Sequence, residues 1–123
     1  MKMYEILELQ FLYPSIANIK MPLKTTYKFT RLMRRAEEEL SFYQEKFTEI
    51  IEEYGVKENG QYKLIENGQA IMIIPGKEAE CNKKLAELRE LDVPINDIKF
   101  AIEELEGLNI SIAELNCLMS IIE

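Results

Sequence analysis

The longest feature in the hydrophobic pattern lies between Pro22 and Gly55. Apolar side chains recur there at alternating spacings of four and three residues, which is the heptad pattern of an amphipathic helix. Pro22 suits the first turn of a helix, and Gly55 suits the position after its last turn. The sequence therefore predicts one helix from about residue 23 to residue 54. Its seam consists of Phe29, Met33, Ala36, Leu40, Tyr43, Phe47, Ile50 and Tyr54.

Two partners fit this seam, and they do not exclude each other. Either the helix packs in the core of its own chain, or it pairs with a helix of another chain in a coiled coil. At about 1.5 Å per residue it would reach roughly 50 Å, which exceeds what a chain with a radius of gyration of about 14 Å can cover. We therefore expect part of the seam to contact another copy in a homo-oligomer. The expected interface consists of Phe29, Met33, Leu40, Tyr43 and Phe47.

The N-terminal segment, residues 4–13, alternates between apolar and polar side chains. In a strand, every second side chain lies on the same face, and one face would carry Leu7, Leu9, Phe11 and Tyr13. We therefore predict a half-buried strand that ends at Pro14. Residues 15–21 fit neither the helical nor the strand period, and their structure stays open.

A β-hairpin is predicted for residues 61–75. Asn67-Gly68 stands between two apolar runs, which favours a type I′ turn. This register pairs Leu64 with Ile71 and Tyr62 with Ile73, and we expect those four side chains to form a core face. The tetrapeptide Glu-Asn-Gly-Gln occurs at 58–61 and again at 66–69, which predicts two turns.

The C-terminal third predicts a helix at 77–92, a strand at 98–102 and a final short helix. Ser111 and Glu114 have the spacing of a capping box at the start of that last helix. Its expected packing residues are Leu115, Leu118, Met119 and Ile122. The order β-α-β-β-α-β-α indicates an α+β fold, with the long helix packed on a small antiparallel or mixed sheet in a single domain, residues 1–123.

The composition argues against catalysis. The 123-residue chain has no histidine, which removes the usual general base and the commonest transition-metal ligand. It also lacks a glycine-rich phosphate loop and metalloprotease or EF-hand motifs. We therefore predict a non-enzymatic protein with no cofactor, no metal and no catalytic residue. Cys81 and Cys117 stand at apolar helix positions and are expected to be reduced thiols.

Targeting signals are missing from the pattern as well. No apolar run approaches the roughly 18 residues that span a bilayer, and the first residues lack the layout of a signal peptide. The sequence therefore predicts a cytoplasmic protein with no membrane partner.

Charge is distributed unevenly along the chain. Residues 1–36 hold seven basic and two acidic residues, so their net charge is +5. Since the whole chain has a net charge of −7, residues 37–123 carry a net charge of −12. We define the basic stripe as Lys24, Lys28, Arg31 and Arg35, which recur at i, i+4, i+7 and i+11 at the start of the long helix. Like charges at these spacings repel, and the helix dipole disfavours cations at its N-terminus.

Two explanations of the basic stripe remain open. Either the acidic remainder of the chain folds over it, or it binds an anionic partner with help from Lys20 and Tyr27. Nucleic acid is disfavoured by the net charge of −7 and by the lack of a recognised binding motif. A small anion, such as a nucleotide held between subunits, fits better, and so does an acidic protein surface.

Two segments carry a resemblance. The junction at residues 20–28, Lys-Met-Pro-Leu-Lys-Thr-Thr-Tyr-Lys, precedes a Glu-rich helix that ends Glu-Glu-Tyr-Gly, and residues 105–115 read Leu-Glu-Gly-Leu-Asn-Ile-Ser-Ile-Ala-Glu-Leu. Both resemble small proteins of unknown function encoded by phages and prophages of Gram-positive bacteria, although Ile112 stands where those proteins favour proline. The resemblance implies a phage-derived accessory protein that acts inside a bacterial host cell.

These observations lead to two hypotheses. The first is an oligomeric binding protein of phage origin that holds an anionic partner along the basic stripe, such as a host signalling nucleotide or a host defence protein. The second is a structural or assembly module that uses the heptad face for protein-protein contacts.

Overall fold

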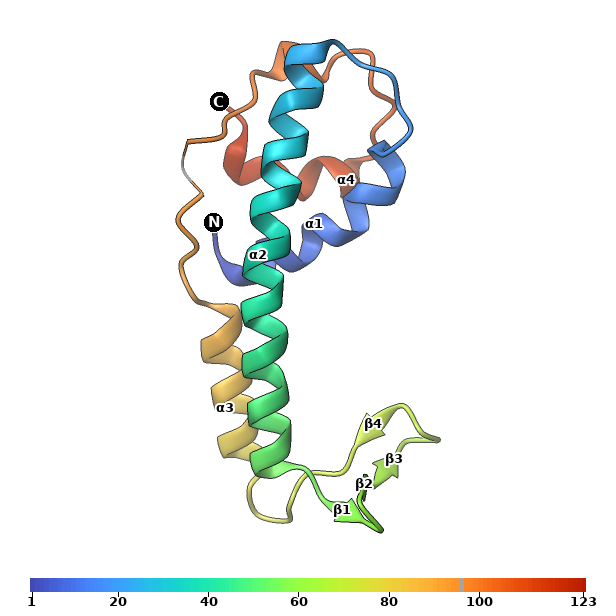
Figure 1. The fold of residues 1–123 in the computed structure, drawn as a ribbon, viewed down its shortest axis with the longest axis vertical. Helices are drawn as coiled ribbons and strands as arrows, with labels where there is room; N and C mark the ends of the chain where they lie inside the picture. The colour runs from blue at the N-terminus through green and yellow to red at the C-terminus, as the bar shows by residue number, and fades with distance from the viewer. Residues whose placement is uncertain (96) are drawn as a thin grey trace. The chain divides into compact units, whose positions relative to one another are not determined.

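The long helix is present with the predicted bounds. In the computed structural model, which describes residues 1–95 and 97–123, α2 spans Leu23–Tyr54 (Figure 1). The fold is α+β, with small antiparallel two-stranded sheets and further helices. The other elements in chain order are α1 Met3–Ile16, β1 Lys57–Glu58, β2 Gln61–Tyr62, β3 Leu64–Ile65, β4 Ala70–Ile71, α3 Glu78–Arg89, the 3-10 helix η1 Ile102–Leu105, α4 Ile112–Asn116 and the 3-10 helix η2 Met119–Ile121.

The end of α2 depends on close packing around Gly55. The backbone N–H of Gly55 donates to the carbonyl oxygen of Ile51 at 2.7 Å. A Cβ atom on Gly55 would lie 2.7 Å from that same oxygen and 2.9 Å from the ring of Tyr62. Any larger residue would therefore have to displace the backbone or the aromatic ring, which explains glycine at this position.

The chain divides into two compact units, each described here by itself. Unit 1 comprises Met1–Ser41 and Leu91–Glu123, and unit 2 comprises Phe42–Glu90. Since α2 runs through both ranges, its two halves contribute to different cores.

The strand predicted at residues 4–13 is wrong, because this segment is helix α1. Its buried side chains are Met3, Ile6, Leu9, Leu12 and Ile16, at spacings of three and four. Phe11, which the strand prediction placed with Leu9, is 78% exposed. Apolar residues are so frequent in this segment that its sequence fits both the alternating pattern of a strand and the three-and-four spacing of a helix. Packing against α2 selects the helix, and Pro14 lies within it rather than at its end.

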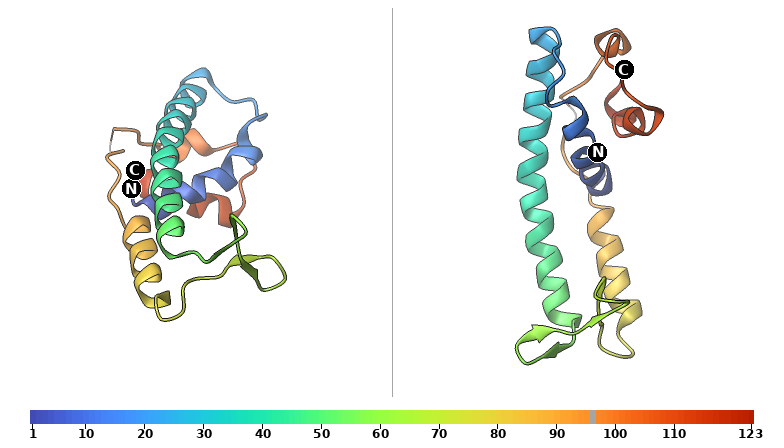
Figure 2. Two further views of the ribbon diagram at one scale, coloured as in Figure 1. Left: turned by 60° about the horizontal axis from the view of Figure 1, so that its bottom comes forward. Right: turned by 90° about the vertical axis from the view of Figure 1, so that its right-hand side faces the viewer.

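The core of unit 1 joins α1, the first half of α2 and the C-terminal segment. Figure 2 shows α1 and the C-terminal segment on the same side of this half of α2. The ring of Phe29 on α2 packs against that of Phe100, with their centroids 4.5 Å apart. Leu12, Leu32, Phe100, Leu118 and Ile121 are completely buried. One face of the predicted heptad seam is thus covered by the chain itself.

The strand predicted at residues 98–102 is also wrong. Ile98 and Phe100 are buried as the alternation requires, but Phe100 forms only an isolated parallel bridge with Ile122. Its N–H donates to Ile121 at 2.8 Å, and its carbonyl accepts from Glu123 at 2.9 Å. The alternation of apolar and polar residues arises because an extended segment buries every second side chain. No neighbouring strand among the described residues pairs with this segment to form a sheet.

Unit 2 contains two hairpins and α3, which lies alongside the second half of α2 (Figure 1). Both copies of Glu-Asn-Gly-Gln are turns, as predicted, and Asn59, Gly60, Asn67 and Gly68 all have the positive φ that type I′ turns require. Leu64 pairs with Ile71 as predicted. Tyr62, however, pairs with Lys57 rather than with Ile73, which bridges to Gly55.

The hairpin residues do not form the predicted core face. Leu64 is 55% exposed, and Tyr62, Ile71 and Ile73 are half-buried. The buried residues of unit 2 lie on the helices instead, at Ile51, Tyr54, Cys81 and Leu88. Two-residue strands offer too little apolar surface to compete with the α2–α3 contact.

The C-terminal capping box is confirmed, but the packing of the helix that follows it is not. Ser111 Oγ accepts from the N–H of Glu114 at 3.1 Å, and Glu114 Oε1 accepts from the N–H of Ser111 at 3.3 Å. The helix ends at Asn116 and η2 follows. Of the four predicted packing residues only Leu118 is fully buried, whereas Met119 is 56% exposed.

Substitutions in α1 distinguish the helix from the predicted strand. We expect Leu12→Ala to lower the free energy of unfolding by about 2 to 5 kcal/mol, because it empties a fully buried position. Phe11→Ala should change it by no more than about 0.5 kcal/mol, because that ring faces solvent. Urea denaturation measures both, and a larger loss from Phe11→Ala would contradict the helix.

Candidate binding surface

The basic stripe lies against the chain's own segment 94–104. Lys28 Nζ donates to Glu104 Oε1 at 2.6 Å and to the carbonyl of Lys99 at 2.7 Å. The Lys28 and Glu104 side chains are only 24% and 18% exposed. The hydrogen bond from Lys28, together with one from the N–H of Ala101, holds the pKa of Glu104 below its usual range. The ammonium also lies 5.6 Å from the centre of the Phe100 ring, so the pair covers the Phe29–Phe100 contact.

Both arginines of the stripe bind one carboxylate. Asp97 accepts from Arg31 at 2.9 Å and from Arg35 at 2.7 Å, and Arg35 also donates to the carbonyl of Pro94. A backbone hydrogen bond at Asp97 and the charges of Arg35 and Arg31 lower the pKa of Asp97. These contacts offset the repulsion between the basic side chains. For Lys28, Arg31 and Arg35, the explanation that acidic residues of the same chain fold over the stripe therefore applies.

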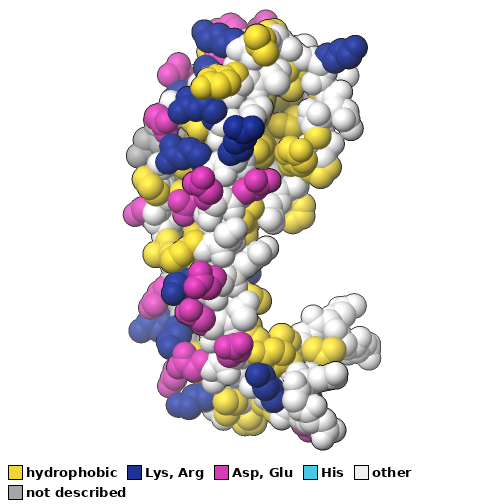
Figure 3. Space-filling view, in the orientation of Figure 1, with side chains coloured by type: hydrophobic (Ala, Val, Ile, Leu, Met, Phe, Trp, Pro, Cys, Tyr) yellow, Lys and Arg dark blue, Asp and Glu magenta, His cyan; other side chains and the backbone are white. Residues whose placement is uncertain are grey.

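The remaining predicted anion ligands lie at the surface. Lys20 and Lys24 are exposed and form no ion pair within residues 1–95 and 97–123. Tyr27 is 62% exposed, and its ring centre lies 5.8 Å from the guanidinium carbon of Arg31. The predicted site therefore does not gather its six residues around one open position. Figure 3 shows Lys and Arg side chains over the first half of α2, with hydrophobic side chains gathered beside them.

A groove that the sequence did not reveal lies between α1 and α2. Its first part is a cavity of about 330 Å³ that extends to the loop at residues 17–22, and its second is a cavity of about 240 Å³ that extends to Leu40. Tyr13, Met33 and Glu37 line both parts, so the two cavities adjoin along the groove. The other lining residues are Leu9, Gln10, Ile16, Ala17, Ile19, Met21, Thr26, Phe29, Thr30, Arg34, Ala36 and Leu40.

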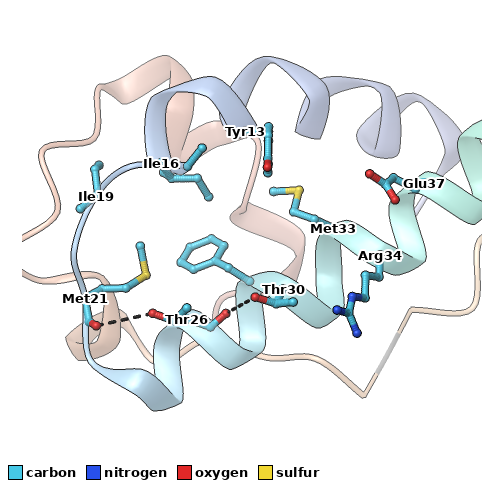
Figure 4. Close-up of a pocket in the computed structure, with 11 residues that line it drawn as sticks. Tyr13, Ile16, Ile19, Met21, Thr26, Thr30, Met33, Arg34 and Glu37 are labelled. Carbon is cyan, nitrogen blue, oxygen red and sulfur yellow. Dashed lines mark hydrogen bonds between the residues drawn. The ribbon is translucent and has the colours of Figure 1, made fainter.

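The groove is apolar inside and polar at its rim. In Figure 4 Tyr13 reaches from α1 toward Met33 on α2, with Ile16 and Met21 farther along the same space. Glu37 points toward α1, whereas the guanidinium of Arg34 lies at the outer side of α2. Neither the Arg34 side chain nor the Glu37 side chain has an ion-pair or hydrogen-bond partner in the described part of the chain.

The polar groups of the groove are few. The Thr26 hydroxyl donates to the carbonyl of Pro22 at 3.2 Å, and the Thr30 hydroxyl donates to the carbonyl of Thr26 at 2.8 Å. Both hydroxyl protons are therefore occupied by the backbone. Pro14 has no N–H, so the carbonyl of Gln10 lacks its usual helical donor. The groove thus offers acceptors along its length and one strong donor, Arg34, at its rim.

One local signal could have revealed the groove. Leu9, Tyr13 and Ile16 stand at spacings of four and three, the same period as the α2 seam. Assigning residues 4–13 to a strand put Tyr13 and Leu9 on a flat face and concealed this second helical surface.

The residues predicted as an oligomer interface divide into two groups. Phe29 and Leu40 are 5% and 9% exposed, so the chain's own fold already covers most of their surface. Met33 in unit 1 is half-buried and lines the groove. Tyr43 and Phe47 in unit 2 are half-buried and stack with ring centroids 5.9 Å apart. An interface at these three residues stays a prediction.

Other chemistry is sparse in the described residues. Both cysteines are free, and burial raises the pKa of Cys81 and of Cys117, which keeps these thiols protonated and poorly nucleophilic. Within residues 1–95 and 97–123, no group of three or more acidic or cysteine side chains is placed to hold a metal ion. None of the described helices combines the length and apolar character that crossing a membrane requires.

Comparisons with protein-family models, curated proteins and solved structures find no match for this chain. The resemblance to small phage and prophage proteins therefore stays a prediction, as does its implication for function.

The Lys28–Glu104 pair should contribute to stability. We expect Lys28→Met to lower the free energy of unfolding by about 1 to 3 kcal/mol, because it leaves a mostly buried carboxylate without its charged donor. Lys46→Met is the matched control, since Lys46 forms an exposed pair with Glu49 and lies 5.7 Å from the centre of the Phe42 ring, and it should cost less than about 0.5 kcal/mol. Urea denaturation at neutral pH compares the two, and equal losses would show that the buried pair has no special role.

The lowered pKa of Glu104 predicts a pH dependence. The ionised carboxylate stabilises the fold above the ordinary value of 4.5, and this contribution is lost as the pH falls through the lower folded-state pKa. Glu104→Gln should therefore reduce the decline in unfolding free energy between about pH 5 and about pH 3. Glu106→Gln, at an exposed position, should retain the wild-type decline. Identical slopes for the wild type and Glu104→Gln would contradict this assignment.

Proposed function

We propose that this chain is a non-enzymatic binding protein of phage or prophage origin that holds an anionic partner in the groove between α1 and α2. The observation that carries the proposal is the groove itself, whose apolar lining stays open to solvent beside Arg34, a side chain without an ion-pair partner in the described part of the chain. In a bacterial host cell, a host defence protein or a signalling nucleotide is the kind of partner that this proposal implies.

The proposed location differs from the basic stripe, which the sequence indicates. Lys28, Arg31 and Arg35 already bind Glu104 and Asp97, so an external anion would have to displace carboxylates that are held in place. Arg34 requires no such exchange. Lys20 lies in the loop between Ile19 and Met21, both of which line the groove, so it is a second cation, at the loop end of the groove.

The apolar lining supports binding as strongly as the charges do. Phe29 supplies a buried floor, and Met33 is half-buried with its thioether facing Tyr13 (Figure 4). Covering such side chains releases about 25 cal/mol for each Å² of apolar surface removed from water. Methionine also adapts its shape to different contacts, which suits a recognition surface.

A second candidate function rests on a different observation. Tyr43 and Phe47 form a stacked, half-buried pair on α2, and the neighbouring Phe42 is 41% exposed. These residues favour an assembly module that joins copies of this chain or binds another protein through the heptad face in unit 2. Native mass spectrometry tests the assembly of copies, because it requires a mass that is a multiple of the mass of one chain.

Substitution at Met33 tests the groove. We expect Met33→Glu to abolish co-purification of the partner from the bacterial host, because it places a charge among apolar side chains and beside Glu37. Native mass spectrometry of the purified protein reports any retained small anion, partner protein or second copy.

The matched control is Met119→Glu, at a methionine that is 56% exposed and does not line the groove. It should leave co-purification unchanged, and thermal melts of both variants establish that they fold. A partner that stays bound to folded Met33→Glu would rule out the groove as the binding site.

A further inference from the structure

We infer that the occupant of the groove is an amphipathic α-helix of a partner protein, with an apolar face and an acidic flank. This inference rests on the proposed function and specifies the chemistry of the partner. Three features of the groove support it, namely its heptad pattern, its dimensions and the positions of its unpaired charges.

The heptad pattern comes from α2. The seam positions Phe29, Met33 and Leu40 all line the groove, together with Ala36. Thr30 and Glu37, which are seven residues apart, flank the seam at the position where coiled coils place their interhelical polar contacts. Along this face α2 therefore presents the surface that a neighbouring helix recognises, and α1 covers only part of it.

The dimensions of the groove fit a helix of about four turns. The α2 wall extends from Thr26 to Leu40, which is roughly 21 Å at 1.5 Å per residue. The opposite wall uses one face of α1, from Leu9 to Ala17. A partner helix that lies along this wall would contact side chains of both α1 and α2.

The unpaired charges indicate how the helix would be oriented. Lys20 calls for an acidic residue at the end of the helix that lies near the 17–22 loop, and Arg34, about halfway along the α2 wall, calls for a second acidic residue there. Glu37, about one turn farther along α2, is shared by both cavities and calls for a basic residue on the partner. A flank with two acidic residues and a basic residue farther along would leave no charge in the groove unmatched.

A small amphiphilic anion fits the same groove less well. Ligand pockets place a few polar groups around the ligand, but here both threonine hydroxyl protons are bound to backbone carbonyls. Among the lining residues, Arg34 alone would offer a charged donor to the head group. The two cavities are also open to solvent, which would leave much of a single alkyl chain in water.

Synthetic peptides test the inference directly. The probe is a fluorescein-labelled peptide of about 16 residues, with leucine at heptad positions a and d and glutamate on its flanks. Matched peptides carry lysine on the flanks or proline at two central positions, which prevents helix formation. Fluorescence anisotropy with the full chain should give a micromolar Kd for the acidic peptide, at least tenfold weaker binding for the lysine peptide and no binding for the proline peptide.

Variants of the chain locate the binding. Met33→Glu should abolish binding of the acidic peptide, and Arg34→Glu should weaken it at least tenfold while improving binding of the lysine peptide. Lys24→Glu makes the same charge change on the side of α2 that carries the stripe, so it should leave the preference between the two peptides unchanged.

Several outcomes would overturn the inference. These are equal affinity for the acidic and lysine peptides, binding of the proline peptide, binding that survives in Met33→Glu, and no peptide binding at all. Binding of dodecanoate without binding of any peptide would identify a small-molecule pocket instead. If Met33→Glu still releases the natural partner while every peptide fails, only the helical occupant is wrong and the proposed function stands.

Discussion

The contact between the first half of α2 and the segment 94–104 organises unit 1. Phe29 packs against Phe100, and the Lys28–Glu104 pair lies over these rings with part of its charge shielded from water. A charged pair in such a place stabilises the fold only when both partners are present, because a lone charge there would lose its hydration without compensation. The same contact consumes most of the basic stripe, so a feature that looked available for a ligand is part of the tertiary structure.

That arrangement leaves the opposite flank of the α2 seam for another role. The C-terminal segment and α1 cover Leu32, Ala36 and much of Phe29, whereas Met33 and Glu37 face the channel beside α1. A helix with a broad apolar face cannot bury all of it against one short neighbour. The part of the apolar face that stays exposed is either an interface or a patch that promotes aggregation. The regular spacing of its apolar residues and the charges at the rim of the groove favour an interface.

Several residues were read correctly from the sequence because their signals are local. The heptad period gave the bounds of α2, the positions of Asn59-Gly60 and Asn67-Gly68 indicated turns, and Ser111 with Glu114 indicated a capping box. Each signal depends on contacts within a few residues, which the sequence contains. The strand predictions at residues 4–13 and 98–102 are wrong because the spacing of apolar residues there fits more than one secondary structure. No capping or terminating residue nearby distinguishes the alternatives. There, the burial of Leu12 and Phe100 by distant segments decided the structure.

The sequence by itself determined the long amphipathic helix, the turns, the lack of histidine chemistry and the concentration of positive charge near residues 20–35. Only the tertiary structure decided what that charge contacts, because Asp97 and Glu104 lie more than sixty residues from the cations they bind. It also created the groove, since a channel between two helices exists only when both are formed and packed. Pairings across long stretches of chain depend on which packed arrangement buries the most apolar surface while leaving no buried charge unpaired, and local patterns do not contain that information.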